Sequence, residues 1–247
     1  MTGTPSYYEE EMMKPHVLEE LDYPPFAGFP KEGIRFLKAL KKNNNRPLFQ
    51  KRKDEYEEVV RFPMQCLIAA LAVRMADVAP EIEFSPKRSI FRIYRDTRFS
   101  KNKTPYKTNI AASFEVKGRK GPTESPGLYV GIAPGEIFIG GGVYMPWGEQ
   151  LKSIRRSIAE RAEEYLAVVN EKRFTKRFGG IMGENLAKAP LGYPKDHPMI
   201  EHLRHKQFFV GVEPNESACH SPKFLNLVAD VFTDALPLVR WLARVTS

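Results

Sequence analysis

The chain has little cysteine, no long apolar run and none of the short signatures by which common enzyme classes are recognised. Its two cysteines, Cys66 and Cys219, lie far apart without a Cys-x-x-Cys pair, which argues against a disulfide framework and against a zinc site. No apolar stretch reaches the roughly 20 residues that a membrane-spanning helix needs. P-loop, His-Glu-x-x-His and Gly-x-Ser-x-Gly patterns are also missing. We therefore predict a soluble protein with no metal or other cofactor and no membrane insertion.

Positive charge, by contrast, is concentrated in one segment. The 247 residues carry a formal net charge of +8, and eleven lysines and arginines lie between positions 85 and 120 against only two acids. Residues 1–25 contain six acids and one lysine and are interrupted by prolines, which matches neither a secretory nor a mitochondrial signal. We expect a cytoplasmic protein with an acidic arm over residues 1–28 and a single domain over residues 29–247.

The spacing of apolar residues predicts helices toward both ends of the chain and strands between them. Apolar positions three or four residues apart indicate helices over residues 31–42, 46–62, 63–75, 147–169, 198–206 and 222–244. Alternating apolar positions indicate strands over residues 89–95, 109–116, 128–133, 136–144 and 207–213. Pro134 and Gly135 suit the centre of a type II turn. The pattern predicts an α+β fold in which helices from the N- and C-terminal parts cover an antiparallel or mixed sheet of about five strands.

A basic strand and the loop after it form the strongest candidate for a functional site. If residues 89–95 pair with residues 109–116, residues 96–108 form a long connection, and connections of this length are often functional. Arginine suits bidentate contact with phosphate or carboxylate, lysine adds mobile positive charge, and interleaved aromatic rings can stack on a ligand. Within residues 88–107 we predict as ligand-binding residues Arg92, Arg95, Asp96, Arg98, Lys103, Tyr106 and Lys107. Asp96 is expected to have a lowered pKa because arginines surround it.

A structural interpretation of the same cations stays open. Strand arginines often pair with carboxylates, and Asp96 and helical acids such as Glu55, Glu57 and Glu58 are available for this. The lysines would then form a solvated loop.

Two other groups of residues are interpreted structurally. The run Gly140–Gly142 follows a strand without opening a nucleotide-binding pattern, so we predict close backbone packing or a bulge there. His202 and His205 have a helical spacing that metal ligands can use. Because Arg204 and Lys206 would repel a cation, a solvated helix face is the preferred interpretation of these histidines.

Four segments carry distinctive strings: FLKALKKNNNRPLFQKRKDEYE, FRIYRDTRFSKNKTPYKTN, FIGGGVYMP and LGYPKDHPMIEHLRHKQF. Together, over about residues 26–213, they resemble successive motifs of the family labelled domain of unknown function 2461. Three residues depart from the pattern of that family: Leu48 replaces a tryptophan, Asn102 an aspartate and Leu191 a lysine. An amide at Asn102 weakens any metal or acid role for the loop. The resemblance implies an α+β fold and carries no established activity over to this chain.

Three classes of function follow from these patterns. The first is a protein that binds a phosphate-bearing or otherwise anionic ligand through residues 88–107, either a small molecule or a polyanion such as nucleic acid. The second is an enzyme that acts on a phosphorylated substrate, in which the cations stabilise negative charge. The third is an interaction module whose basic loop binds an acidic partner, for which residues 9–22 of the same chain are one candidate. We favour the first class. Residues 92–107 contain six lysines and arginines against one acid, which favours anion binding over structural pairing.

Overall fold

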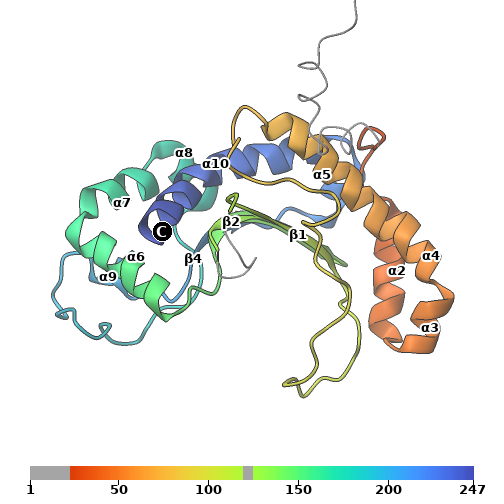
Figure 1. The fold of residues 1–247 in the computed structure, drawn as a ribbon, viewed down its shortest axis with the longest axis horizontal. Helices are drawn as coiled ribbons and strands as arrows, with labels where there is room; N and C mark the ends of the chain where they lie inside the picture. The colour runs from red at the N-terminus through yellow and green to blue at the C-terminus, as the bar shows by residue number, and fades with distance from the viewer. Residues whose placement is uncertain (1–22, 119–124) are drawn as a thin grey trace, which may run out of the picture.

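A four-stranded antiparallel sheet lies at the centre of the computed structural model, which describes residues 23–118 and 125–247 (Figure 1). The strands are adjacent in chain order: β1 (Ile110–Glu115), β2 (Gly127–Ala133), β3 (Glu136–Val143) and β4 (Phe208–Val212). Pro134 and Gly135 connect β2 to β3, and Gly135 has a φ of +81°, as the third residue of a type II turn requires. The acidic arm predicted over residues 1–28 lies, up to residue 22, outside the described residues.

Helices precede and follow the sheet, and the predicted α+β class is therefore confirmed. Those before it are α2 (Lys31–Lys42), α3 (Arg46–Lys51), α4 (Lys53–Tyr56), the π-helical turn η2 (Glu57–Arg61) and α5 (Phe62–Met75). Those after β3 are α6 (Gly148–Glu160), α7 (Ala162–Val169), α8 (Lys172–Phe178), α9 (Ile200–Leu203), the 3-10 turn η3 (Glu216–His220) and α10 (Lys223–Val245). Within residues 23–118 and 125–247, no helix has the length and apolar character needed to cross a bilayer.

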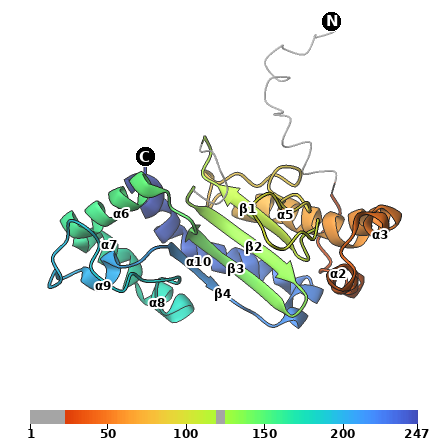
Figure 2. The same cartoon turned by 90° about the horizontal axis from the view of Figure 1, so that it is seen from below.

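One face of the sheet is buried against α10 and holds the core. Successive strand residues point to opposite faces, so Phe114, Val130, Ile139 and Val210 share this face, and all four are buried. The ring of Phe114 meets that of Phe232 in α10 edge to face, with centroids 5.5 Å apart. Helix α10 lies behind the sheet in Figure 2. The opposite face, here called the open face, is turned toward the viewer in that figure and has no described helix packed across it.

The strand predicted over residues 89–95 does not form as a regular strand. Two isolated bridges replace it, Ile90 with Ala112 and Tyr94 with Tyr106. Three residues, 91–93, lie between the bridges on one side, and five residues, 107–111, lie between them on the other. The second segment therefore has two extra residues, which bulge out of the pairing. A bulge interrupts the ladder of hydrogen bonds, which explains why the sheet has four strands where about five were predicted.

Backbone pairing between these two segments nevertheless continues toward the loop, beyond the predicted start of the second strand at residue 109. The amide of Arg95 donates to the carbonyl of Pro105 at 2.9 Å. The unpaired connection is therefore residues 96–104 and not residues 96–108. In Figure 1 this connection, called the basic loop below, extends from the sheet on the side away from α10.

Local signals set the boundaries of the first helices. The side chain of Asn45 accepts a hydrogen bond from the amide of Leu48 at 2.9 Å, as expected for the residue before α3. The sequence predicted separate helices over residues 46–62 and 63–75. In the structure the π-helical turn η2 leads into α5 at Phe62 without a loop, and Pro63 lies in the first turn of α5.

Candidate functional site

Two cations of the predicted ligand site bond inside the basic loop itself. The guanidinium of Arg95 donates to the carbonyl oxygen of Thr104 at 3.2 Å and also to the hydroxyl of that residue. The ammonium of Lys103 donates to the carbonyl oxygen of Thr97 at 2.9 Å. These side chains hold the two arms of the loop together. The structural interpretation from the sequence was different, because it paired Arg95 with carboxylates and left Lys103 in a solvated loop.

Asp96 and Arg98 form an ion pair at the exposed surface of the loop, with 2.7 Å between Arg98 Nη2 and Asp96 Oδ2. Hydrogen bonds from Arg98 lower the pKa of Asp96 to about 2, which confirms the predicted direction. The charge of Arg92 acts in the same direction from further away. Arg92 is exposed, and none of the described carboxylates lies within 4.0 Å of its guanidinium. Of these three residues, Arg92 is the one available to a ligand.

Tyr106 lies in the core and not on the surface. Its side chain is 1% exposed, and its ring stacks on that of Phe49 with centroids 4.2 Å apart. The next residue, Lys107, is half-buried, and its amide donates to the carbonyl of Ile93 at 2.8 Å. The position of Lys107 is thus determined by a buried neighbour on one side and by backbone pairing on the other.

A continuous row of aromatic rings crosses the open face. Ring centroids are 6.3 Å apart between Phe91 and Tyr129, 6.1 Å between Tyr129 and Phe138, and 6.0 Å between Phe138 and Phe209. Tyr144 continues the row at 5.4 Å from Phe209. These five rings, called the aromatic row below, come from the segment before the basic loop, from β2, β3 and β4, and from the residue after β3. They form an apolar surface suited to flat ligands.

Glycines beneath the aromatic row let two of its rings lie along the sheet. A Cβ atom added at Gly131 would come within 2.6 Å of the hydroxyl of Tyr129 and within 2.9 Å of its ring. A Cβ added at Gly211 would come within 2.2 Å of Phe138, and one at Gly140 within 3.0 Å of the same ring. Any larger residue would lift these rings from the sheet. Close packing, which the sequence predicted for the glycine run, is therefore confirmed, and it shapes the open face.

The open face contains a hollow of about 680 Å³, called the sheet hollow below. All five rings of the aromatic row line it. Lys107 also lines it and is the one predicted ligand residue that does so. Two carboxylates, Glu136 and Glu213, complete the charged part of the lining. Neither is in an ion pair with any residue that the structure describes.

Burial and a neighbouring cation disfavour the charged form of Lys107, whereas one aromatic contact favours it. Its Nζ atom lies 4.9 Å from the centroid of the Phe91 ring, a cation–π distance at which the ring attracts the ammonium. No carboxylate of the described chain comes within 4.0 Å of it. Burial lowers the pKa of Lys107, and the positive charge of Arg92 lowers it further. An anion bound in the sheet hollow would supply the negative charge that this lysine lacks.

The two histidines with metal-ligand spacing are not on a solvated helix face, and that interpretation is wrong. His202 Nδ1 lies 3.2 Å from the hydroxyl of Tyr165, and the ring of His205 meets Phe208 edge to face. Burial lowers the pKa of both histidines. No cluster of three or more metal-ligating side chains occurs in the described part of the chain.

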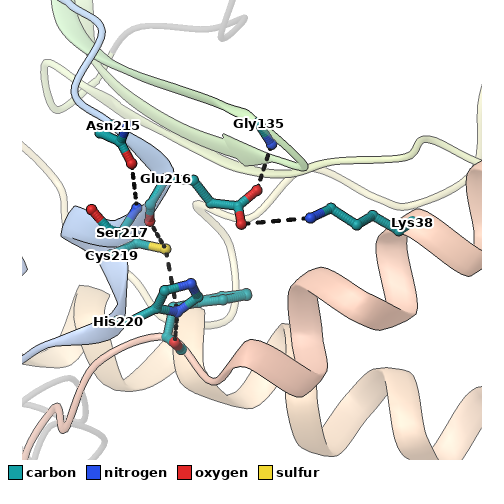
Figure 3. A network of polar contacts seen from close by, with 8 residues as sticks. Lys38, Gly135, Asn215, Glu216, Ser217, Cys219 and His220 are labelled. Carbon is teal, nitrogen blue, oxygen red and sulfur yellow. Dashed lines mark hydrogen bonds and ion pairs between the residues drawn. The ribbon is translucent and has the colours of Figure 1, made fainter.

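A second hollow, of about 450 Å³, is lined by residues of α2 and of η3. Figure 3 shows Glu216 between Gly135 and Lys38: one carboxylate oxygen accepts from the amide of Gly135 at 2.6 Å, and the other lies 3.6 Å from the ammonium of Lys38. His220 Nδ1 lies 2.7 Å from the carbonyl oxygen of Phe29. These groups bond to one another, which gives the network a role in joining the β2–β3 turn to the helices.

Cys219 belongs to the same network but has the surroundings of an inert thiol. Its Sγ atom donates to the carbonyl of Glu216 at 3.1 Å and lies 3.8 Å from His220 Nδ1. Burial, followed by the charge of Glu216, raises the pKa of the thiol to about 11. A thiol that stays protonated at neutral pH is a poor nucleophile. Cys66 is buried as well.

A family model described as Conserved hypothetical protein (DUF2461) matches residues 32–241. The chain belongs to this family. The match includes the basic loop, the aromatic row and both hollows except for Lys31. A search of curated proteins finds no match to the chain.

The departures from the DUF2461 pattern noted in the sequence lie away from the sheet hollow. The side chain of Asn102 accepts hydrogen bonds from the amide and hydroxyl of Thr104, so it organises the basic loop. Leu191 is fully exposed. Leu48 is half-buried in α3.

Sequence reasoning missed the aromatic row, although one signal for it was present. Tyr129, Phe138 and Phe209 occupy the strand positions that alternate with the core positions. Outward-facing positions of a half-covered sheet are usually polar. Three large aromatic residues at such positions are therefore a pattern along the chain that indicates a binding surface.

Proposed function

We propose that the protein binds a small anionic ligand with a flat aromatic group in the sheet hollow of the open face. The observation that carries this proposal is the half-buried Lys107, which lies beside the aromatic row without a carboxylate partner among the described residues. The proposal keeps the anionic ligand predicted from the sequence. It narrows the predicted site, residues 88–107, to Lys107 and Arg92 beside the aromatic row.

The aromatic row supports the flat part of the ligand. Its rings lie at the surface of a sheet whose glycines leave room for them. Stacking of one flat ring on an aromatic side chain contributes about 1–3 kcal/mol in protein–nucleic acid complexes. Five rings in contact offer several places for such stacking.

Lys107 and Arg92 support the anionic part. Lys107 lines the sheet hollow, and Arg92 is close enough to lower its pKa. A guanidinium can contact a phosphate or carboxylate through two parallel hydrogen bonds, while an ammonium adds a point charge. Arg95, Arg98 and Lys103 would act indirectly, by holding the loop in place.

The size and charge of the sheet hollow favour a small ligand over a polyanion. Its volume of about 680 Å³ is within the roughly 300–1,000 Å³ of small-molecule sites. Glu136 and Glu213 would repel a continuous phosphate backbone that crosses the open face. A single anionic group beside Lys107 and Arg92 would meet less of this repulsion.

Thermal shift and calorimetry with adenosine monophosphate (AMP), adenosine and inorganic phosphate test the proposal. AMP has both a flat ring and a phosphate, so it should stabilise the protein more than either part. A ligand at about 100 times its Kd adds about 2.7 kcal/mol. For a chain of this size that corresponds to roughly 5–10 °C in Tm.

The matched variants are Lys107→Met and Lys101→Met, since Lys101 is an exposed lysine of the basic loop. Lys107→Met should weaken AMP binding by about tenfold or more, the loss of a charge-assisted contact, and Lys101→Met should not. Equal affinity of both variants for AMP, or no more stabilisation by AMP than by phosphate, would overturn the proposal. The enzymatic and protein-docking alternatives then become the leading hypotheses.

A further inference from the structure

We propose that Lys107 is a reactive amine that forms an imine with a carbonyl group of a ligand in the sheet hollow. This inference rests on the proposed function, because the same hollow binds the ligand. It adds a covalent step to binding and so assigns a chemical class to the ligand: a flat anion that carries an aldehyde or ketone.

The geometry around Lys107 is that of an amine kept from forming an ion pair. Its side chain is half-buried in the lining of the sheet hollow, and no described carboxylate is within 4.0 Å. Two lysines with ion pairs show the contrast. Lys152 and Lys206 lie 2.7 Å and 2.8 Å from the carboxylates of Glu149 and Glu184. A carboxylate partner favours the ammonium form, which cannot attack a carbonyl.

Two further features favour the neutral amine. The apolar rings of the hollow desolvate the ammonium form, and Arg92 places a second positive charge nearby. Both effects lower the pKa of Lys107. Burial in an apolar pocket and a neighbouring cation are the two known ways in which proteins activate a lysine for imine formation. Lys107 has both.

The reaction balances without an oxidant or reductant. The lone pair of the neutral amine attacks the carbonyl carbon to give a carbinolamine, in which the carbonyl oxygen has become a hydroxyl. Loss of that hydroxyl as water forms the carbon–nitrogen double bond, and addition of water reverses the reaction. Glu136 and Glu213 line the same hollow and provide carboxylates that can accept and return the proton moved in these steps.

Pyridoxal 5′-phosphate is a suitable reagent, because it joins an aldehyde to a flat ring and a phosphate. The protein is incubated with about one equivalent of it, the imine is reduced with borohydride to a stable amine, and the labelled peptides are mapped by mass spectrometry. We expect Lys107 to carry several-fold more label than the exposed Lys101, because a lowered pKa leaves a larger share of its amine neutral. The label should also appear at lower pH than on free N-acetyl-lysine.

Two controls separate reactivity from accessibility. Lys107→Arg keeps the positive charge and should remove the selective label, whereas Lys101→Arg should leave it unchanged. AMP should compete with the reagent for Lys107. The inference is overturned if the label is spread evenly over exposed lysines or if Lys107 reacts at the pH of free N-acetyl-lysine. If AMP binds but Lys107 is not labelled selectively, the imine proposal fails and the binding proposal stands. If AMP does not bind and Lys107 is not labelled selectively, both proposals fail.

Discussion

Asn44 and Tyr106 are 62 positions apart in the chain and exchange two hydrogen bonds. The side-chain Nδ2 of Asn44 donates to the carbonyl of Tyr106 at 2.9 Å, and its Oδ1 accepts from the Tyr106 amide at 3.0 Å. The side-chain amide of Asn44 thus forms hydrogen bonds with both the amide and the carbonyl of Tyr106, as a neighbouring strand would. The contact joins the connection between α2 and α3 to the base of the basic loop, immediately before Lys107. The position of the candidate site therefore depends on the N-terminal helices.

Asn44→Ala should destabilise the protein by about 1–3 kcal/mol, because a buried amide and carbonyl lose their partners. It should also weaken AMP binding, since Lys107 follows Tyr106. Urea denaturation and calorimetry measure the two effects. Asn102→Ala is the matched control, because Asn102 bonds only within the exposed loop. An Asn44 variant as stable as the Asn102 variant would contradict this account of the loop base.

Gly211→Ala should disturb the aromatic row. The new methyl group would lie 2.2 Å from the ring of Phe138, so the ring has to move. We expect a loss of about 1–3 kcal/mol in the free energy of unfolding, typical of overpacking, and weaker AMP binding. Gly148→Ala has no atom within 4 Å of the new methyl group and should cost no stability. Equal denaturation midpoints for the two variants would show that the glycine does not control the ring.

Mild acid should reduce stability through His202 and His205. Burial lowers the pKa of both from 6.5, so the unfolded chain takes up protons more readily than the folded one below that pH. The contribution of the neutral rings to the free energy of unfolding is fully present above about pH 6.5. It is lost as the pH falls from there through the lower pKa values of the folded state. The negative charge of Glu201 raises the pKa of both histidines and so opposes the effect of burial. The two rings are neighbours, and the charge of His202 lowers the pKa of His205.

Urea midpoints measured between about pH 7.5 and pH 5.5 test this expectation, because carboxylates with a lowered pKa, such as Asp96, Glu55 and Glu184, titrate below this range. The double variant His202→Gln and His205→Gln should show a flatter dependence than the original chain. An unchanged slope would mean that these histidines do not couple folding to pH.

Glu136→Gln should tighten the binding of AMP. Removing a carboxylate from the lining of the sheet hollow removes repulsion of the phosphate, which at a partly exposed site is worth about 1 kcal/mol, or roughly fivefold in Kd. Binding of uncharged adenosine should not change. Glu149→Gln, on the exposed surface of α6, is the control. Tighter binding of adenosine and AMP alike would point to a packing effect instead of repulsion.

Alternation of apolar residues was sufficient to predict most of the sheet. It predicted strands over residues 109–116 and 128–133, and these strands pair and bury Phe114 and Val130. It failed for residues 89–95, because the two-residue bulge opposite them depends on where the partner segment is held. Asn44 and Phe49 hold that segment, and no local pattern connects them to Tyr106.

The sequence by itself determined the α+β class, the turn at Pro134 and Gly135, and the concentration of positive charge before β1, since each depends on neighbouring residues. Only the tertiary structure decided which charges are available. Arg95, Arg98 and Lys103 bond to groups of the basic loop, whereas Lys107 lies over the ring of Phe91 in a hollow lined by rings from separate strands. The pairing of charges and the assembly of the aromatic row depend on distances between residues that are far apart in the chain. Those distances cannot be predicted from the spacing of apolar residues along the sequence.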